Sequence, residues 1–161
     1  MANPAYLQLV RNPLQGQATA PGWVGWIEVS QVRYDTREPK PSGTQNGGSR
    51  RGEEVTVLKE FDSSSSVLFE SMSKNRPFDS MTIDLVGTDP AFGPAAKASR
   101  RLRIECTGVR VMKIQTVLPN TMQPAQASDP SSSLQSVRLT CASIKLSATR
   151  HDENSDRWSE R

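Results

Sequence analysis

Histidine is almost absent from this chain, with one residue in 161, His151 near the C-terminus. Catalytic triads that use histidine, and metal sites with histidine ligands, are therefore excluded from the body of the sequence. No GxxxxGKS/T or GxGxxG loop is present either, and Gly43, Gly47 and Gly48 open no helix. Nothing in the sequence calls for an enzyme, a cofactor or a bound metal.

Cysteine and long apolar runs are also scarce. Cys106 and Cys141 each fall inside a strand pattern, so we expect two buried thiols, with a disulfide between neighbouring strands as the alternative. No run approaches the roughly 18 apolar residues of a membrane span, which predicts no membrane insertion. The N-terminal MANPAYLQLVRNP lacks the basic region and apolar core of a signal peptide, so we expect a protein made in the cytosol.

Charge of one sign is not in excess, because 20 basic residues stand against 17 acidic ones, for a net charge of +3. This balance does not predict a nucleic-acid partner. Arg100, Arg101 and Arg103 form a basic cluster beside the apolar Leu102 and Ile104. We interpret the arginines as the polar face of a strand, and a phosphate-binding patch is the alternative.

Alternating apolar residues predict about seven strands. The apolar set changes face within residues 23–35 and again after Ser143, and each change predicts a bulge or bend. Gly108 marks a turn, so we expect the strand after it to pair back as a hairpin. The predicted strands are residues 5–11, 23–35, 53–61, 79–86, 100–107, 109–118 and 134–150.

The two faces of these strands carry different side chains. Asp84 and Glu105 lie on otherwise polar faces, so we expect solvated carboxylates rather than a general acid–base pair. Val55, Val57 and Phe61 share the apolar face of the third strand.

One helix interrupts the strands, at about residues 63–75. Serine hydroxyls accept hydrogen bonds from the free N–H groups of a first helical turn, so we expect one serine of the run at its start to be the N-cap. Leu68, Phe69 and Met72 form a narrow apolar stripe on this helix. Pro77 prevents its continuation.

Strands with a single helix predict a mainly β fold, a curled antiparallel β-barrel or sandwich whose open face the helix covers. We expect one domain over residues 1–150 and a polar, flexible tail over 151–161. Residues 36–52, 87–99 and 119–133 are long polar loops, and such loops either serve a purpose or are disordered. Both interpretations stay open.

Three segments resemble the Hcp family, the haemolysin-coregulated tube proteins of type VI secretion systems. Residues 25–35 (GWIEVSQVRYD) are similar to an early strand of that family. Residues 55–72 (VTVLKEFDSSSSVLFESM) resemble its strand, serine stop and short helix, although the usual proline after the serines is absent. Residues 136–150 (SVRLTCASIKLSATR) resemble its final strand, including the switch of apolar face.

The resemblance implies a β-barrel with one helix, an Hcp-like subunit that forms homohexameric rings. Rings would stack into a tube that a contractile sheath expels. The implied partners are further copies, the sheath proteins, a VgrG-type spike and small effector proteins carried in the lumen. The protein would be cytoplasmic before firing and then secreted without a signal peptide.

The resemblance also implies roles for particular residues. The long loop at residues 36–52 would join one ring to the next, and a disordered surface loop is the alternative. Its candidate contacts are Arg37, Lys40, Arg50 and Arg51. A water-filled lumen would accommodate the polar faces of two strands, although the face that looks inward stays open. These polar-face residues are Thr82, Asp84, Arg101 and Arg103.

A different class of protein remains an alternative, a monomeric β-sandwich that binds a carbohydrate or a protein. Trp23 and Trp26 near a loop would then form a ligand platform, whereas in a tube subunit they are packing residues. An enzyme on this scaffold is disfavoured by the missing catalytic groups. The native mass in solution separates a hexamer from a monomer.

Overall fold

The computed structural model describes residues 4–11, 14, 16–35, 53–87, 99–117 and 134–148. The predicted loops at 36–52 and 119–133, most of the loop at 87–99 and the tail at 151–161 lie outside these residues. The described residues form seven strands and one helix. In chain order they are β1 (Ala5–Val10), β2 (Ile27–Asp35), β3 (Glu53–Glu60), α1 (Ser64–Ser73), β4 (Phe78–Gly87), β5 (Ser99–Val117), β6 (Leu134–Cys141) and β7 (Ser143–Ala148).

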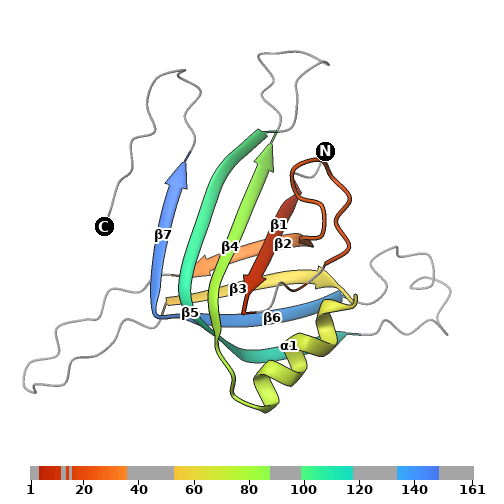
Figure 1. The fold of residues 1–161 in the computed structure, drawn as a ribbon, viewed down its shortest axis with the longest axis vertical. Coiled ribbons are helices and arrows are strands. Elements are labelled where there is room, and N and C mark those ends of the chain that lie inside the picture. The colour runs from red at the N-terminus through yellow and green to blue at the C-terminus, as the bar shows by residue number, and fades with distance from the viewer. Residues whose placement is uncertain are drawn as a thin grey trace, which may run out of the picture.

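The strands close into an antiparallel barrel (Figure 1). Their order is β4-β1-β2-β3-β6-β5, and an additional pairing of β4 with β5 completes the circle of six. β7 lies outside the circle and pairs with the first half of β5. The predicted mainly β barrel with a single helix is therefore confirmed. Closure pairs β4 with β5, whereas β7 ends the sheet and pairs only with β5 among the described residues.

The interior is filled by the apolar faces of the strands, which alternate with polar residues as the sequence predicts. Inward side chains on facing strands are almost fully excluded from solvent, and α1 adds Leu68 to the same cluster. The most deeply buried are Leu7, Leu9, Ile27, Val29, Val55, Val57, Leu68, Phe78, Met81, Ile83, Val109, Val137 and Leu139. Cys106 and Cys141 join this core as buried thiols rather than a disulfide, as expected.

Both predicted changes of apolar face are real irregularities. In β2 the pairing with β3 shifts register between Val29 and Gln31, which is the expected bulge. The predicted last strand breaks at Ala142 into β6 and β7. β6 pairs with β3 and β5, whereas β7 pairs with β5 beyond the barrel. The bend therefore moves the chain out of the barrel wall.

The predicted hairpin at Gly108 is wrong, because β5 runs through it as one strand. Gly108 has a φ of 59°, and a Cβ there would lie 2.8 Å from the Cβ of Ala142. The residues of β5 up to Val109 pair with β4, and those from Arg110 onward pair with β6. The glycine thus serves a bend at which β5 changes partner, since it tolerates a left-handed backbone that other residues resist.

The apolar residues around α1 divide differently from the prediction. Leu68 and Met72 pack on the core as expected, whereas Phe61 and Phe69 are each 60% exposed. β3 ends at Glu60, so the chain has left the sheet before Phe61 and its parity no longer places it inside. In Figure 1, α1 lies at the end of the barrel beside β5 and β6.

Candidate functional surfaces

A row of side chains crosses the sheet on the face away from the core. Asp84 of β4 stands opposite Tyr6 of β1 on one side and Arg103 of β5 on the other. Asp84 is only 1% exposed. The expectation of a solvated carboxylate at this position is therefore wrong, because the β1–β2 connection packs over this part of the sheet.

The buried carboxylate is neutralised by a bidentate ion pair. Arg103 donates from Nε to Oδ1 of Asp84 at 2.6 Å and from Nη2 to Oδ2 at 2.7 Å. These hydrogen bonds raise the pKa of the Arg103 guanidinium, with partial burial acting in the opposite direction. Such paired geometry is what makes a buried charge tolerable.

Trp23 completes the assembly from the β1–β2 connection. Its indole N–H donates to Oδ2 of Asp84 at 2.9 Å. Its ring stacks on Tyr6, with centroids 5.1 Å apart and planes 14° from parallel. Trp26 packs against the same small cluster as Trp23. Both tryptophans therefore pack against this cluster, as expected for a tube subunit.

The predicted polar-face residues divide into distinct environments. Thr82 is partly exposed and pairs across strands with Glu105, while the Arg103 side chain is 28% exposed and bound to Asp84. The side chain of Arg101 lies outside the described residues. The structure thus joins two of the four residues and leaves their relation to a lumen as a prediction.

The candidate ring-stacking residues all lie in a segment outside the described residues. Their role stays a prediction. These residues are Arg37, Lys40, Arg50 and Arg51.

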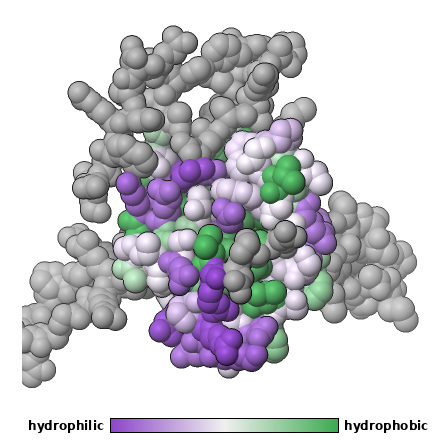
Figure 2. Space-filling model, in the orientation of Figure 1, coloured by the Kyte–Doolittle hydropathy of each residue, from purple (hydrophilic) through white to green (hydrophobic). Residues whose placement is uncertain are grey.

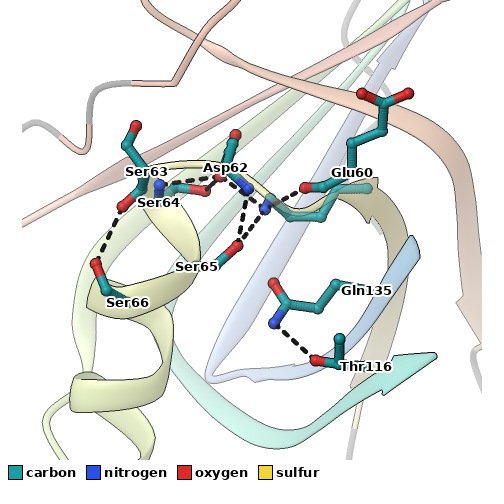
Figure 3. A network of polar contacts seen from close by, with 9 residues as sticks. Glu60, Asp62, Ser63, Ser64, Ser65, Ser66, Thr116 and Gln135 are labelled. Atoms are coloured by element: carbon teal, nitrogen blue, oxygen red, sulfur yellow. Dashed lines mark hydrogen bonds and ion pairs between the residues drawn. The ribbon is translucent and has the colours of Figure 1, made fainter. Parts of the chain in front are cut away.

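A second polar network lies where β3 meets α1 (Figure 3). The Lys59 side chain is fully buried. Its Nζ donates to Oδ1 of Asp62 at 2.8 Å, to the main-chain oxygen of Glu60 at 2.7 Å and to Oγ of Ser65 at 3.0 Å. The sequence analysis did not predict that Lys59 is buried. The sequence nevertheless indicates it, because Lys59 lies on the same strand face as the buried Val55 and Val57.

Asp62 rather than a serine hydroxyl caps the helix. Ser63 occupies the N-cap position, as predicted, but the Ser64 N–H donates to Oδ1 of Asp62 at 2.9 Å. The Asp62 N–H in turn donates to Oγ of Ser65 at 3.2 Å. This reciprocal pair satisfies donors that the first helical turn leaves free. The serines therefore shape the helix start, together with a carboxylate.

A groove of about 330 Å³ opens between α1 and the adjoining ends of β5 and β6. Gln135, which is 3% exposed, donates from Nε2 to Oγ1 of Thr116 at 3.3 Å. Within the described part of the chain, its Oε1 has no hydrogen-bond partner. The groove is lined by Phe61, Ser65, Ser66, Phe69, Met72, Ile114, Thr116 and Gln135.

The rest of the described surface is mixed in character. Figure 2 shows separate green apolar patches among polar side chains on the face in view. Among the described residues, no group of three or more His, Cys, Asp or Glu side chains is placed to hold a metal ion. No helix in the described ranges has the length and apolar content needed to cross a membrane.

Comparison with known proteins decides what kind of barrel this is. A family model described as "Type VI secretion system effector, Hcp" matches residues 6–147. The chain belongs to the Hcp family. No protein of curated function matches the sequence significantly.

Solved Hcp structures share the fold at low sequence identity. Hcp1 of E. coli EAEC 042 is 20% identical with a TM-score of 0.71, and the match covers 91% of this chain and 92% of that one. Hcp1 of Salmonella typhimurium is 15% identical with a TM-score of 0.72, covering 92% and 87%. Hcp3 of Pseudomonas aeruginosa, described as a secreted protein, is 15% identical with a TM-score of 0.69, covering 99% and 100%.

Family membership confirms the resemblance seen in the three sequence segments. The protein is a type VI secretion protein of the Hcp class, a family of structural, secreted tube proteins whose members assemble into rings. The Hcp fold and family favour this assignment over an isolated β-sandwich binding module.

Proposed function

We propose that this Hcp protein is a subunit of homohexameric rings that stack to form the inner tube of a type VI secretion system. The observation that carries the proposal is the Hcp family match, which runs through every described strand and the helix. A contractile sheath would expel the tube. Sheath proteins, a VgrG-type spike and small effectors in the lumen are the partners that this role requires.

The polar strand face and the long loop have separate parts in this proposal. Thr82, Arg101 and Arg103 contribute polar side chains to a water-filled lumen, while Asp84 holds the Arg103 guanidinium in position. The segment at 36–52 contacts the next ring through its basic residues. The protein resides in the cytoplasm until firing and then leaves the cell inside the tube.

The native mass of the protein tests this proposal. Light scattering coupled to size exclusion, over a wide concentration range, should give a mass six times that of the 17.7 kDa chain. Negative-stain images of the same fractions should contain rings with a central hole. A strict monomer at every concentration would overturn the ring, and with it the tube.

A further inference from the structure

The seam between α1 and the second half of β5 carries two features that the proposed function leaves without a partner. Near the start of α1 the seam opens into the groove, where Phe61 and Phe69 expose apolar rings. At the other end of α1, Arg110 of β5 donates to Oδ1 of Asn75 at 2.8 Å. A helix of ten residues is roughly 15 Å long, and this length separates the two features.

The feature at the C-terminal end of α1 is a concentration of positive charge. We call it the cation cluster, and its members are Arg11, Lys74, Arg76 and Arg110. The hydrogen bond from Lys74 lowers the pKa of the Glu70 carboxyl, and the charges of Arg76 and Arg11 lower it further. Three of the four cations therefore surround one carboxylate. Among the described residues, the pair of Lys74 with Glu70 is the ion pair of the cluster.

The arginines of the cluster are held by neutral groups instead of carboxylates. Arg110 uses the amide oxygen of Asn75, and Arg11 donates from Nη1 to the main-chain oxygen of Pro77 at 3.0 Å. Arg76 is exposed and forms no ion pair within the described part of the chain. Charge that is positioned but not neutralised favours an anionic partner. The seam thus combines an apolar groove with a site for carboxylates.

One segment of this chain, residues 151–161, matches both features. It lies outside the described residues, and its sequence carries four carboxylates against two arginines together with Trp158. The other long segments outside the described residues do not offer this combination. Residues 36–52 are basic, residues 88–98 carry one acid and one base, and residues 118–133 carry a single carboxylate.

The spacing within residues 151–161 fits the spacing along the seam. Asp152 and Glu153 precede Trp158 by five or six positions, which is roughly 17–21 Å of extended chain. This span covers the length of α1 that separates the cation cluster from the groove. An indole buries a large apolar area, so it suits a groove lined by aromatic rings. The carboxylates suit the guanidinium groups.

The described end of β7 lies on the side of the barrel away from α1. In Figure 1, β7 points upward, whereas α1 lies at the lower end, where hydrophilic side chains also gather in Figure 2. A segment that continues from Ala148 therefore starts far from the seam of its own copy. In a stack of copies with one orientation, it starts beside the seam of the next copy. Such heterologous contacts repeat along a stack.

We propose that residues 151–161 of one copy dock along the α1–β5 seam of a copy in the next ring. Asp152 and Glu153 lie against the cation cluster, and the Trp158 indole fills the groove between the two exposed phenylalanine rings. The contact rests on the proposed stacking of rings. It gives the cation cluster, the groove and Trp158 a common partner, which is a second copy of this chain.

Zero-length crosslinking tests the contact directly. Rings of unlabelled protein are mixed with rings of isotope-labelled protein, allowed to stack and treated with a carbodiimide, which joins a lysine amine to a carboxylate. Mass spectrometry should find Lys74 joined to Asp152 or Glu153 in peptide pairs that combine one labelled and one unlabelled partner. Lys113 is the matched control, because it is exposed on β5 but lies outside the cation cluster and the groove.

Charge reversal tests the energetics. Arg76→Glu should weaken the stacking of rings about two- to fivefold, the range expected for one exposed ion pair. Asp152→Arg added to Arg76→Glu should recover part of this loss, because the pair is restored with its signs exchanged. Lys113→Glu makes the same change of charge outside the cluster and should weaken stacking less. Trp158→Ser should also weaken stacking, because it empties the groove. Light scattering first confirms that each variant forms rings.

The outcomes separate this contact from the function on which it rests. Wild-type protein that forms no stacked rings would remove both proposals. Stacked rings in which residues 151–161 crosslink only within peptide pairs of one label, or crosslink to Lys40 in place of Lys74, would overturn this contact alone. Undiminished stacking of Arg76→Glu would overturn it too. Mixed-label pairs at Lys74 together with recovery in the charge-exchanged variant would support it.

Discussion

Asp84 and Arg103 face each other across β4 and β5, and the buried carboxylate accepts two hydrogen bonds from the guanidinium. Trp23 donates a third from a segment 61 positions earlier in the chain. One carboxylate therefore ties the β1–β2 connection to the barrel wall. This polar anchor, together with the apolar cluster of Tyr6, Ala18 and Val86, holds the connection against the outer face of the sheet.

Replacing only the arginine of the buried Asp84–Arg103 pair should lower the free energy of unfolding more than replacing both residues. Arg103→Met removes the bidentate partner of the buried Asp84 carboxylate, and we expect a loss of about 3 kcal/mol in the free energy of unfolding. The double variant Asp84→Asn/Arg103→Met should lose less than Arg103→Met alone. Urea unfolding measures both. Equal losses would show that the carboxylate is not stranded when the arginine is removed.

The buried lysine at the helix start should matter more than an exposed one. Lys59→Met keeps the packing of the side chain but removes three hydrogen bonds, including one to the Asp62 carboxylate. We expect a loss of about 2–3 kcal/mol. Lys74→Met, which removes the exposed pair with Glu70, is the matched control and should change stability far less. Similar thermal shifts for both variants would contradict the assignment.

The bend in β5 should depend on Gly108. Alanine there must adopt a φ of 59° and places its Cβ 2.8 Å from that of Ala142. We expect Gly108→Ala to lower the free energy of unfolding by about 1–2 kcal/mol from backbone strain, with the contact adding to it. Adding Ala142→Gly removes the contact but not the strain, so it should restore part of the loss. No recovery in denaturant unfolding would mean that strain alone sets the cost.

The free energy of unfolding at alkaline pH should depend on the Tyr6 phenol. Burial raises the pKa of the Tyr6 phenol, and the nearby Glu28 carboxylate raises it further. The folded state thus prefers the neutral phenol. This contribution is complete below the unfolded-state pKa of about 10 and is lost as the pH rises towards the folded-state value. Wild type should therefore lose more stability than Tyr6→Phe between about pH 8 and pH 10.5 in urea titrations. Equal losses of stability in wild type and Tyr6→Phe would contradict this prediction.

The segment at 36–52 should act between rings rather than within them. Deleting residues 40–50 removes Lys40 and Arg50 and should leave hexameric rings intact while reducing stacked tubes. Light scattering reports the ring and electron micrographs report the tube length. A variant that replaces the same residues with a neutral sequence of equal length separates charge from loop length. Normal tubes from the deletion would end the ring-stacking assignment.

Local patterns predicted most of the secondary structure. Period-two alternation placed the strands, the change of apolar face in β2 predicted its bulge, and the change after Ser143 predicted the break between β6 and β7. The short helix followed from the serine run and from Leu68 and Met72. These features depend on neighbours within a few residues, so the sequence alone carries them.

The predictions from sequence were wrong or incomplete at places where segments far apart in the chain come into contact. Gly108 is compatible with a turn or with a bend, and only the pairing of β5 with both β4 and β6 decides between them. Phe61 has the parity of a buried residue, but its strand ends one position earlier. Sequence reasoning did not find Gln135 because its surroundings come from α1 and β5, which are remote in the chain.

The sequence by itself determined a mainly β chain with one capped helix, two bent strands and the family to which they belong. Only the tertiary structure decided that Asp84 is buried against Arg103 and Trp23, and that Lys59 is enclosed by the start of α1. The physical reason is that the alternation of apolar and polar residues indicates only which face of a strand a side chain occupies. Whether that face meets water depends on segments that arrive from elsewhere in the chain.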